Sequence, residues 1–242
     1  MMRATAGHLL GGRVAHEQPA EGHRTGIEPV LLAASIPARA GERVLEGGTG
    51  SGAGLLCLAA RVPGVHAIGV ERDADMAALA RRNVAANGFE AAIETADLLE
   101  YRPDGAIDHA FANPPWHAAG GTPSPIRSKE DAKRAEAGGV ARWVVALAAG
   151  LRQGGTLTVI VPPACLPECL SALAAARCGT ARILPLWPRR GMEARLLILR
   201  GTRDGRGPCR MLPGLVLHGD GPGGYTDEAS AILRDGRGFA VG

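Results

Sequence analysis

The sequence predicts an α/β fold in which a mainly parallel sheet is covered by helices on both faces. Short apolar segments alternate with segments of helical periodicity, an alternation typical of strand–helix–strand units. The length of 242 residues suffices for one such domain and is too short for two full ones. A hydrophobic fraction of 46% excludes a disordered chain.

The predicted elements follow one another in a regular order. The first is a helix over about 28–36, whose first turn tolerates Pro29. The seven predicted strands are 43–46, 67–71, 91–95, 107–112, 156–161, 181–186 and 194–200. The intervening helices are predicted at about 53–61, 74–87, 131–150 and 165–176. Gly154-Gly155 is expected to turn into the fifth strand.

One domain is expected over residues 1–242, in three parts. Residues 1–36 are an N-terminal segment and helix, of which the first 22 residues show no clear pattern. Residues 37–200 form the core, and 201–242 form an extension of short strands, turns and a helical turn near 227–233. In such sheets ligands bind at the carboxyl ends of the strands.

Composition narrows the possible partners. A net charge of +3 permits a nucleic-acid partner without demanding one. The five cysteines form no C-x-x-C pair, and the N-terminal histidines share no metal-ligand spacing with them, so we expect no disulfide framework and no metal site. No leader-like start and no apolar stretch of about 18 residues occur, so we expect a cytoplasmic protein without a membrane partner.

The strongest local signal is the glycine loop Leu45-Glu-Gly-Gly-Thr-Gly-Ser-Gly52 between a strand and a helix. Glycines let the backbone turn tightly and let a ligand approach it closely. Two further acids, Glu71 and Asp97, end or follow the next two strands. The first could accept hydrogen bonds from both hydroxyls of a ribose, and the second could accept one from an adenine amino group.

Other uses of this loop are possible. Gly48-x-Gly50-x-x-Ala53, with Glu71 about 20 residues on, also fits a dinucleotide fingerprint, and a glycine turn without any ligand is a further alternative. A nucleotide-hydrolase phosphate loop is excluded because no Gly-Lys-Ser/Thr follows. Glu46 favours a different ligand, since a carboxylate before the glycines repels a pyrophosphate and suits an amino group and a sulfonium.

A second motif, Asn113-Pro-Pro-Trp116, follows the fourth predicted strand. The prolines end the strand and stiffen the turn. The amide oxygen of Asn113 and the carbonyl of Pro114 could accept the two N–H bonds of a planar amino group, and Trp116 could stack on its ring. A rigid turn without function is the alternative, but a position beside the glycine loop favours the functional interpretation.

Together these motifs resemble those of class I S-adenosylmethionine (SAM)-dependent methyltransferases, which implies a Rossmann-like fold and SAM as the cofactor. The Asn-Pro-Pro-aromatic form resembles the branch that methylates adenine N6, cytosine N4 or a glutamine side chain. Segment 18–33 and Pro188-Arg-Arg-Gly191 narrow the resemblance to the tRNA-1(Val) adenine N6-methyltransferase family. That family has two aromatics and an Asp where this chain has His23, Thr25 and Glu28.

The resemblance implies two sets of site residues, and basic side chains in two loops give a third, substrate-binding set. The catalytic candidates are Asn113, Pro114, Pro115 and Trp116. The cofactor-binding candidates are Glu28, Glu46, Gly48, Gly50, Gly52, Glu71, Asp97 and Asn113. The substrate-binding candidates, which are otherwise exposed turn or helix-start residues, are Arg127, Lys129, Arg134, Arg189 and Arg190.

The resemblance also implies a substrate. We expect methylation of adenine N6 in an RNA, preferably tRNA. The alternatives are a protein glutamine N5-methyltransferase and a non-catalytic RNA-binding protein of the same fold.

Overall fold

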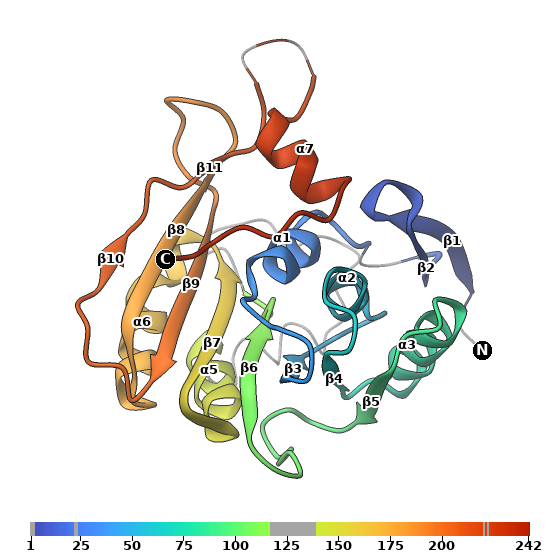
Figure 1. Ribbon diagram of the computed structural model, residues 1–242, viewed down its shortest axis with the longest axis horizontal. Helices are drawn as coiled ribbons and strands as arrows, with labels where there is room; N and C mark the ends of the chain where they lie inside the picture. Colours follow the sequence, from blue (N-terminus) through green and yellow to red (C-terminus); the bar gives the residue numbers. More distant parts are fainter. Residues whose placement is uncertain (1–2, 22–23, 117–138, 220, 222) are drawn as a thin grey trace.

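A large sheet forms the centre of the molecule (Figure 1). The computed structural model describes residues 3–21, 24–116, 139–219, 221 and 223–242. The strands of the sheet are β3 (Arg43–Gly47), β4 (His66–Glu71), β5 (Ala91–Thr95), β6 (Ile107–Ala112), β7 (Leu151–Val161), β8 (Cys178–Trp187), β9 (Leu196–Arg203), β10 (Arg210–Met211) and β11 (Leu215–Val216). Their order across the sheet is β10-β8-β9-β7-β6-β3-β4-β5, and β11 also pairs with β8.

The predicted mostly parallel sheet is confirmed, with two additions. Among the described residues, the two-residue strands β10 and β11 extend the seven predicted strands to nine. The strand β9 is antiparallel to both of its neighbours, β7 and β8, whereas the others pair in parallel. The chain therefore reverses direction once inside the sheet, at β9.

The prediction for the start of β7 was wrong. The strand begins at Leu151, and Gly154 and Gly155 lie inside it instead of forming the turn before it. A shift of register between Ile107 and His109 of the neighbouring β6 marks an irregularity at this point. Glycine inside a strand often marks such a bulge, because no side chain obstructs the bend.

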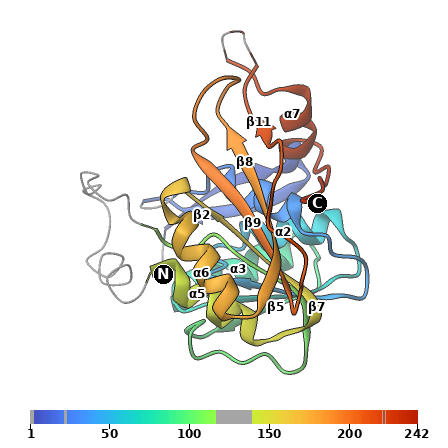
Figure 2. The same cartoon turned by 90° about the vertical axis from the view of Figure 1, so that its left-hand side faces the viewer.

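Helices cover the sheet on both faces, as predicted. They are α1 (Glu28–Ser35), α2 (Ala53–Arg61), α3 (Ala74–Ala86), α5 (Gly139–Ala149), α6 (Leu166–Ala175) and α7 (Asp227–Leu233). The first three share one apolar core, and α5 and α6 share the other. Figures 1 and 2 together show α5 and α6 on the face opposite α1 and α2. Within the described ranges, no helix has the length and apolar character to cross a membrane.

An N-terminal hairpin was not anticipated from the sequence. It consists of β1 (Ala4–Leu9) and β2 (Val14–Pro19), which pair antiparallel and are joined by a short 3-10 turn at Leu10–Gly12. The first strand is largely exposed, so its sequence carries no apolar alternation. Only the second strand buries side chains, which include Val14 and His16.

The C-terminal extension packs into the same core as α1. Ala229 and Ile232 of α7 are buried there with Leu31. The buried guanidinium of Arg200 donates hydrogen bonds to the carbonyl oxygens of Val241, at 3.4 Å, and Ser35. The last residues of the chain are thereby joined to the end of α1.

Candidate functional site

The glycine loop leaves the carboxyl end of β3 and leads into α2. Gly48, Gly50 and Gly52 have φ angles of +64°, +57° and +90°, in the left-handed region that L side chains rarely adopt. At Gly48 an added Cβ would also lie 2.5 Å from the Trp143 ring of α5. Gly48 itself is exposed, so its backbone is open to a ligand. The three glycines of the motif are therefore required by the conformation of the loop.

Glu46, the last residue but one of β3, lies beneath this loop and is only 5% exposed. Its Oε2 accepts hydrogen bonds from Thr49 Oγ1 at 2.5 Å and from the Leu55 backbone N–H at 2.9 Å. Burial raises the pKa of Glu46 to about 7, although these two hydrogen bonds act in the opposite direction. The carboxylate thus supports the loop from below and stands close to its titration point at neutral pH.

The second acid, Glu71, ties the loop to β4. Its Oε2 accepts a hydrogen bond from Gly50 N–H at 3.0 Å, and its Oε1 accepts one from Asp73 N–H at 2.9 Å. The third acid, Asp97, follows β5 and accepts a hydrogen bond from Leu99 N–H at 2.9 Å. Since β3, β4 and β5 are adjacent and parallel, the three predicted acids lie at the same edge of the sheet.

The Asn-Pro-Pro-Trp motif begins directly beyond β6. Gly47 of β3 and Ala112 of β6 are paired residues, so Asn113 and Gly48 leave the sheet side by side. Pro114 is buried, and Trp116 is partly buried against the core of α5 and α6. The sheet register therefore brings the two sequence motifs together.

The remaining predicted residues have other surroundings. Glu28 begins α1 and, among the described residues, makes no hydrogen bond to the glycine loop. Arg189 donates hydrogen bonds to the carbonyl oxygens of Gly219 and Gly221, which fixes a nearby loop, whereas Arg190 is exposed. Three predicted substrate-binding residues lie outside the described ranges: Arg127, Lys129 and Arg134.

Sequence reasoning missed two contacts of the glycine loop. One is the Trp143 ring at Gly48, which arises from the packing of α5 and has no sequence signal. The other is a hydrogen bond of 2.9 Å between His16 Nε2 and Ser51 Oγ. It could not be anticipated, because the hairpin that carries His16 was not predicted.

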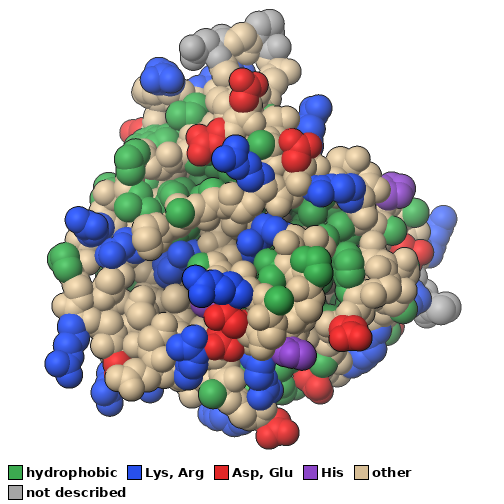
Figure 3. Space-filling view, in the orientation of Figure 1, with side chains coloured by type: hydrophobic (Ala, Val, Ile, Leu, Met, Phe, Trp, Pro, Cys, Tyr) green, Lys and Arg blue, Asp and Glu red, His purple; other side chains and the backbone are tan. Residues whose placement is uncertain are grey.

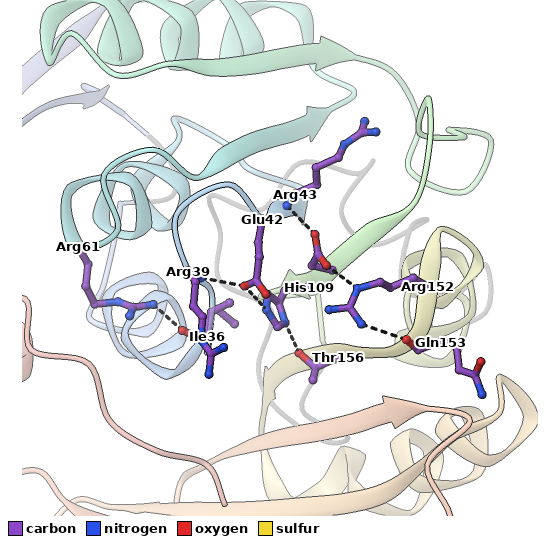
Figure 4. Close-up of polar contacts among 10 residues, drawn as sticks. Ile36, Arg39, Glu42, Arg43, Arg61, His109, Arg152, Gln153 and Thr156 are labelled. Carbon is purple, nitrogen blue, oxygen red and sulfur yellow. Dashed lines mark hydrogen bonds and ion pairs between the residues drawn. The ribbon is translucent and has the colours of Figure 1, made fainter.

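A second polar cluster lies at the amino ends of β3 and β6 (Figure 4). His109 Nε2 lies 3.0 Å from Glu42 Oε2, and His109 Nδ1 lies 2.8 Å from Thr156 Oγ1. Asp108 accepts hydrogen bonds from Arg43 N–H at 2.8 Å and from Arg152 Nε at 2.5 Å. Each acid of this cluster has a basic side chain as its partner.

The acids at the carboxyl ends of β3, β4 and β5 have different partners from the acids of this cluster. Within the part of the chain that the structure describes, no Lys, Arg or His forms an ion pair with Glu46, Glu71 or Asp97. Carboxylates without a cationic partner suit a ligand that carries positive charge. Together with the open backbone of Gly48, they fit a cofactor with an amino group, a sulfonium and a ribose. No group of three potential metal-ligating side chains occurs among the described residues.

The glycine loop after β3 and the acids at the ends of the next two strands lie where the resemblance to class I SAM-dependent methyltransferases implies, and solved methyltransferase structures share the fold. The protein is an enzyme of this class, and SAM is its cofactor. The chain belongs to the methyltransferase small domain family, whose family model matches residues 27–162.

Individual relatives agree with this assignment. A protein of Aeromonas hydrophila named tRNA1(Val) (adenine(37)-N6)-methyltransferase is 32% identical over 219 residues, 85% of this chain and 86% of the relative. A protein of Bacteroides thetaiotaomicron with the same name is 28% identical over 142 residues, 57% of this chain and 60% of the relative.

Solved structures share the fold. A predicted O-methyltransferase from Agrobacterium tumefaciens has a TM-score of 0.73 and 23% identity, covering 88% of this chain and 98% of its own. The 16S rRNA N2 G1207 methyltransferase of T. Thermophilus, in complex with AdoMet and guanosine, has a TM-score of 0.59 and 21% identity, covering 84% and 51%.

Proposed function

We propose that this enzyme methylates the exocyclic N6 of an adenine in tRNA. The observation that carries the proposal is the pairing of Gly47 with Ala112, from which the glycine loop and Asn113 leave the sheet side by side. An amino group held at Asn113 would then lie beside the loop that binds the cofactor. The names of the tRNA methyltransferase relatives support the substrate class.

The proposed chemistry assigns a role to three residues of the motif. An exocyclic amino nitrogen is a weak nucleophile because its lone pair is delocalised into the ring. Asn113 Oδ1 and the Pro114 carbonyl would accept its two N–H bonds and so direct the lone pair out of the ring plane. Trp116 would stack on the base. Bound SAM would supply the methyl group at its sulfonium and leave as a neutral thioether when the S–CH3 bond breaks, and the methylated nitrogen would then lose one proton to solvent.

The proposal extends to the whole chain, which we treat as one methyltransferase unit. The core 37–200 would hold the cofactor, and residues 1–36 and 201–242 would flank it. The burial of α7 in the same core as α1 supports a single unit. Figure 3 shows Lys and Arg side chains spread among acidic ones on one face, so no single basic patch stands out there.

Transfer of labelled methyl groups tests the substrate. Purified enzyme and labelled SAM are incubated with total tRNA, ribosomal RNA and bulk protein from a strain that lacks the protein. We expect label in tRNA, released on nuclease digestion as N6-methyladenosine. Label confined to protein would instead indicate the glutamine methyltransferase.

Calorimetry separates the remaining alternatives. SAM binding without transfer to any of the three pools would favour the non-catalytic RNA-binding alternative. Binding of NAD in place of SAM would contradict the assignment of the site as a whole.

A further inference from the structure

The free edge of β2 is held by two asparagines, Asn83 of α3 and Asn87 directly after that helix. Asn87 Oδ1 accepts a hydrogen bond from Ala15 N–H at 2.9 Å, and its Nδ2 donates to the Ala15 carbonyl at 2.8 Å. One turn earlier, Asn83 makes the same pair of hydrogen bonds with Glu17, both at 2.8 Å. The two side-chain amides thus take the place of a neighbouring strand, and they fix the hairpin on α3.

Between these two anchored residues, His16 reaches the glycine loop. Its Nε2 lies 2.9 Å from Ser51 Oγ, and both side chains are buried, with 3% and 6% exposure. The carbonyl of the same serine accepts a hydrogen bond of 2.9 Å from Asn83 Nδ2. Burial lowers the pKa of His16, so the imidazole is neutral at physiological pH. Ser51 is therefore held at both its hydroxyl and its carbonyl.

Ser51 lies at the part of the loop with the greatest backbone freedom. Gly50 and Gly52 flank Ser51, and both have positive φ angles. Glycine loses more conformational freedom on ordering than any other residue, so a loop of this composition is costly to hold in one shape. Buried hydrogen bonds at Ser51 reduce that cost before the cofactor binds, which is the general basis of preorganisation.

We propose that His16 is a positioning residue of the cofactor site, which acts through Ser51 to hold the glycine loop in its binding conformation. The inference rests on the assignment of this loop to SAM. It assigns the N-terminal hairpin a role in cofactor affinity, separate from any role in substrate binding.

The test compares variants by calorimetry with SAM. His16→Phe keeps the approximate ring volume and removes the hydrogen bond, and we expect the dissociation constant to rise roughly threefold to tenfold, as for loss of one buried hydrogen bond. His16→Gln can still reach the serine hydroxyl and should restore affinity to within about twofold. His8→Phe, an exposed histidine on the other strand of the hairpin, is the matched control and should bind as the wild type does.

A double-mutant cycle shows whether His16 acts through Ser51. Ser51→Ala removes the partner hydroxyl, and His16→Phe/Ser51→Ala should bind no more weakly than the weaker single variant. In kinetic assays the loss should fall on KM for SAM, with kcat retained at saturating cofactor. If His16→Phe fails to fold, His16→Leu, which also removes the hydrogen bond, takes its place alone and together with Ser51→Ala in the cycle.

Three results would overturn the proposal. They are an unchanged SAM affinity in folded His16→Phe, additive effects in the cycle, or a lowered melting temperature without any change in affinity. Failure of the wild-type protein to bind SAM would instead contradict the cofactor assignment, so the two failures are distinguishable.

Discussion

The two ends of β3 and β6 carry acidic residues whose partners differ. At the amino ends, Asp108 forms an ion pair with Arg152, and Glu42 is hydrogen-bonded to His109, whose pKa is lowered by burial. At the carboxyl ends, Glu46 accepts hydrogen bonds from Thr49 and backbone N–H only, with no cationic partner among the described residues. Among the described residues, the acids at the amino ends of these strands therefore have a basic side chain as partner, whereas Glu46 at the carboxyl end of β3 has none.

This difference teaches how to recognise the functional end of the sheet. A carboxylate that is paired with a basic side chain inside the protein attracts a cationic ligand only weakly. Its pairing contributes to stability instead. An acid without such a partner costs stability unless a cation binds there. The predictions below test whether function and stability divide between the two ends in this way.

The largest expected effect is that of Asn113→Ala at the carboxyl end of β6. Loss of an acceptor for the reacting amino group should lower kcat about 100-fold to 1000-fold, as for removal of one positioned hydrogen-bonding group in other enzymes. SAM binding should be retained by calorimetry, because the glycine loop and the acids at the strand ends remain in place. The matched control is Asp108→Asn at the other end of the same strand, which should keep its turnover per folded molecule. Equal losses of activity in both variants would contradict the division.

The next largest effect is expected for Glu71→Gln. This carboxylate accepts a hydrogen bond from Gly50 N–H in the loop and is proposed to bind the ribose, so its loss should weaken SAM binding about 10-fold to 100-fold. Glu42→Gln removes a carboxylate from the amino-end cluster and should leave the SAM dissociation constant unchanged. Calorimetry measures the SAM dissociation constant of both variants. A loss of affinity in Glu42→Gln would show that the two ends are not separate.

These predictions combine what the sequence reveals with what only the structure reveals. The seven strands and their order along the chain could be predicted, because apolar runs alternate regularly with helical segments. The hairpin could not, because only β2 buries side chains and β1 is mostly exposed. Gly154 and Gly155 were mistaken for a turn, since glycine marks turns and strand irregularities alike.

The candidate site was predicted to a similar extent. Glycine spacing and strand-end acids located the loop, and the sheet register then placed Asn113 beside it. The depth of Glu46 could not be predicted, because burial depends on how α2 packs over the loop. The contacts of Trp143 and His16 come from elements distant in sequence, so no local pattern indicates them.

A third prediction concerns stability at the amino end. His109→Phe removes the imidazole, which is buried, and with it the hydrogen-bond partner of Thr156 and one of the two partners of Glu42, which keeps the Arg39 N–H. The free energy of unfolding should fall by about 1–3 kcal/mol, measured by urea denaturation, with SAM affinity retained. His66→Phe, an exposed histidine at the start of β4, is the control and should change stability little. An equal loss in both variants would show that the cluster contributes nothing specific.

The smallest expected effect is a pH dependence that originates at Glu46. Burial raises the pKa of this carboxyl to about 7 in the folded protein, so its contribution to stability is fully present below its unfolded pKa and is lost as pH rises through about 7. The same deprotonation places a negative charge beneath the loop, which should favour the positively charged cofactor. SAM affinity should therefore rise roughly threefold between pH 6 and pH 8.

Glu46→Gln separates this effect from other titrations. The variant keeps a hydrogen-bond acceptor beneath Thr49 and Leu55 but has no charge to gain, so its SAM affinity should vary less with pH than that of the wild type. Its unfolding free energy should also lose the decline expected toward pH 7. The Asp108→Asn variant is the matched control. Burial alone would raise the pKa of Asp108, but hydrogen bonds from Arg43 and Arg152 lower it overall, so this acid does not titrate between pH 6 and pH 8. If the wild type and Glu46→Gln show the same pH profile, the charge of Glu46 does not contribute to SAM binding. Its hydrogen bonds to the loop then remain as its only function.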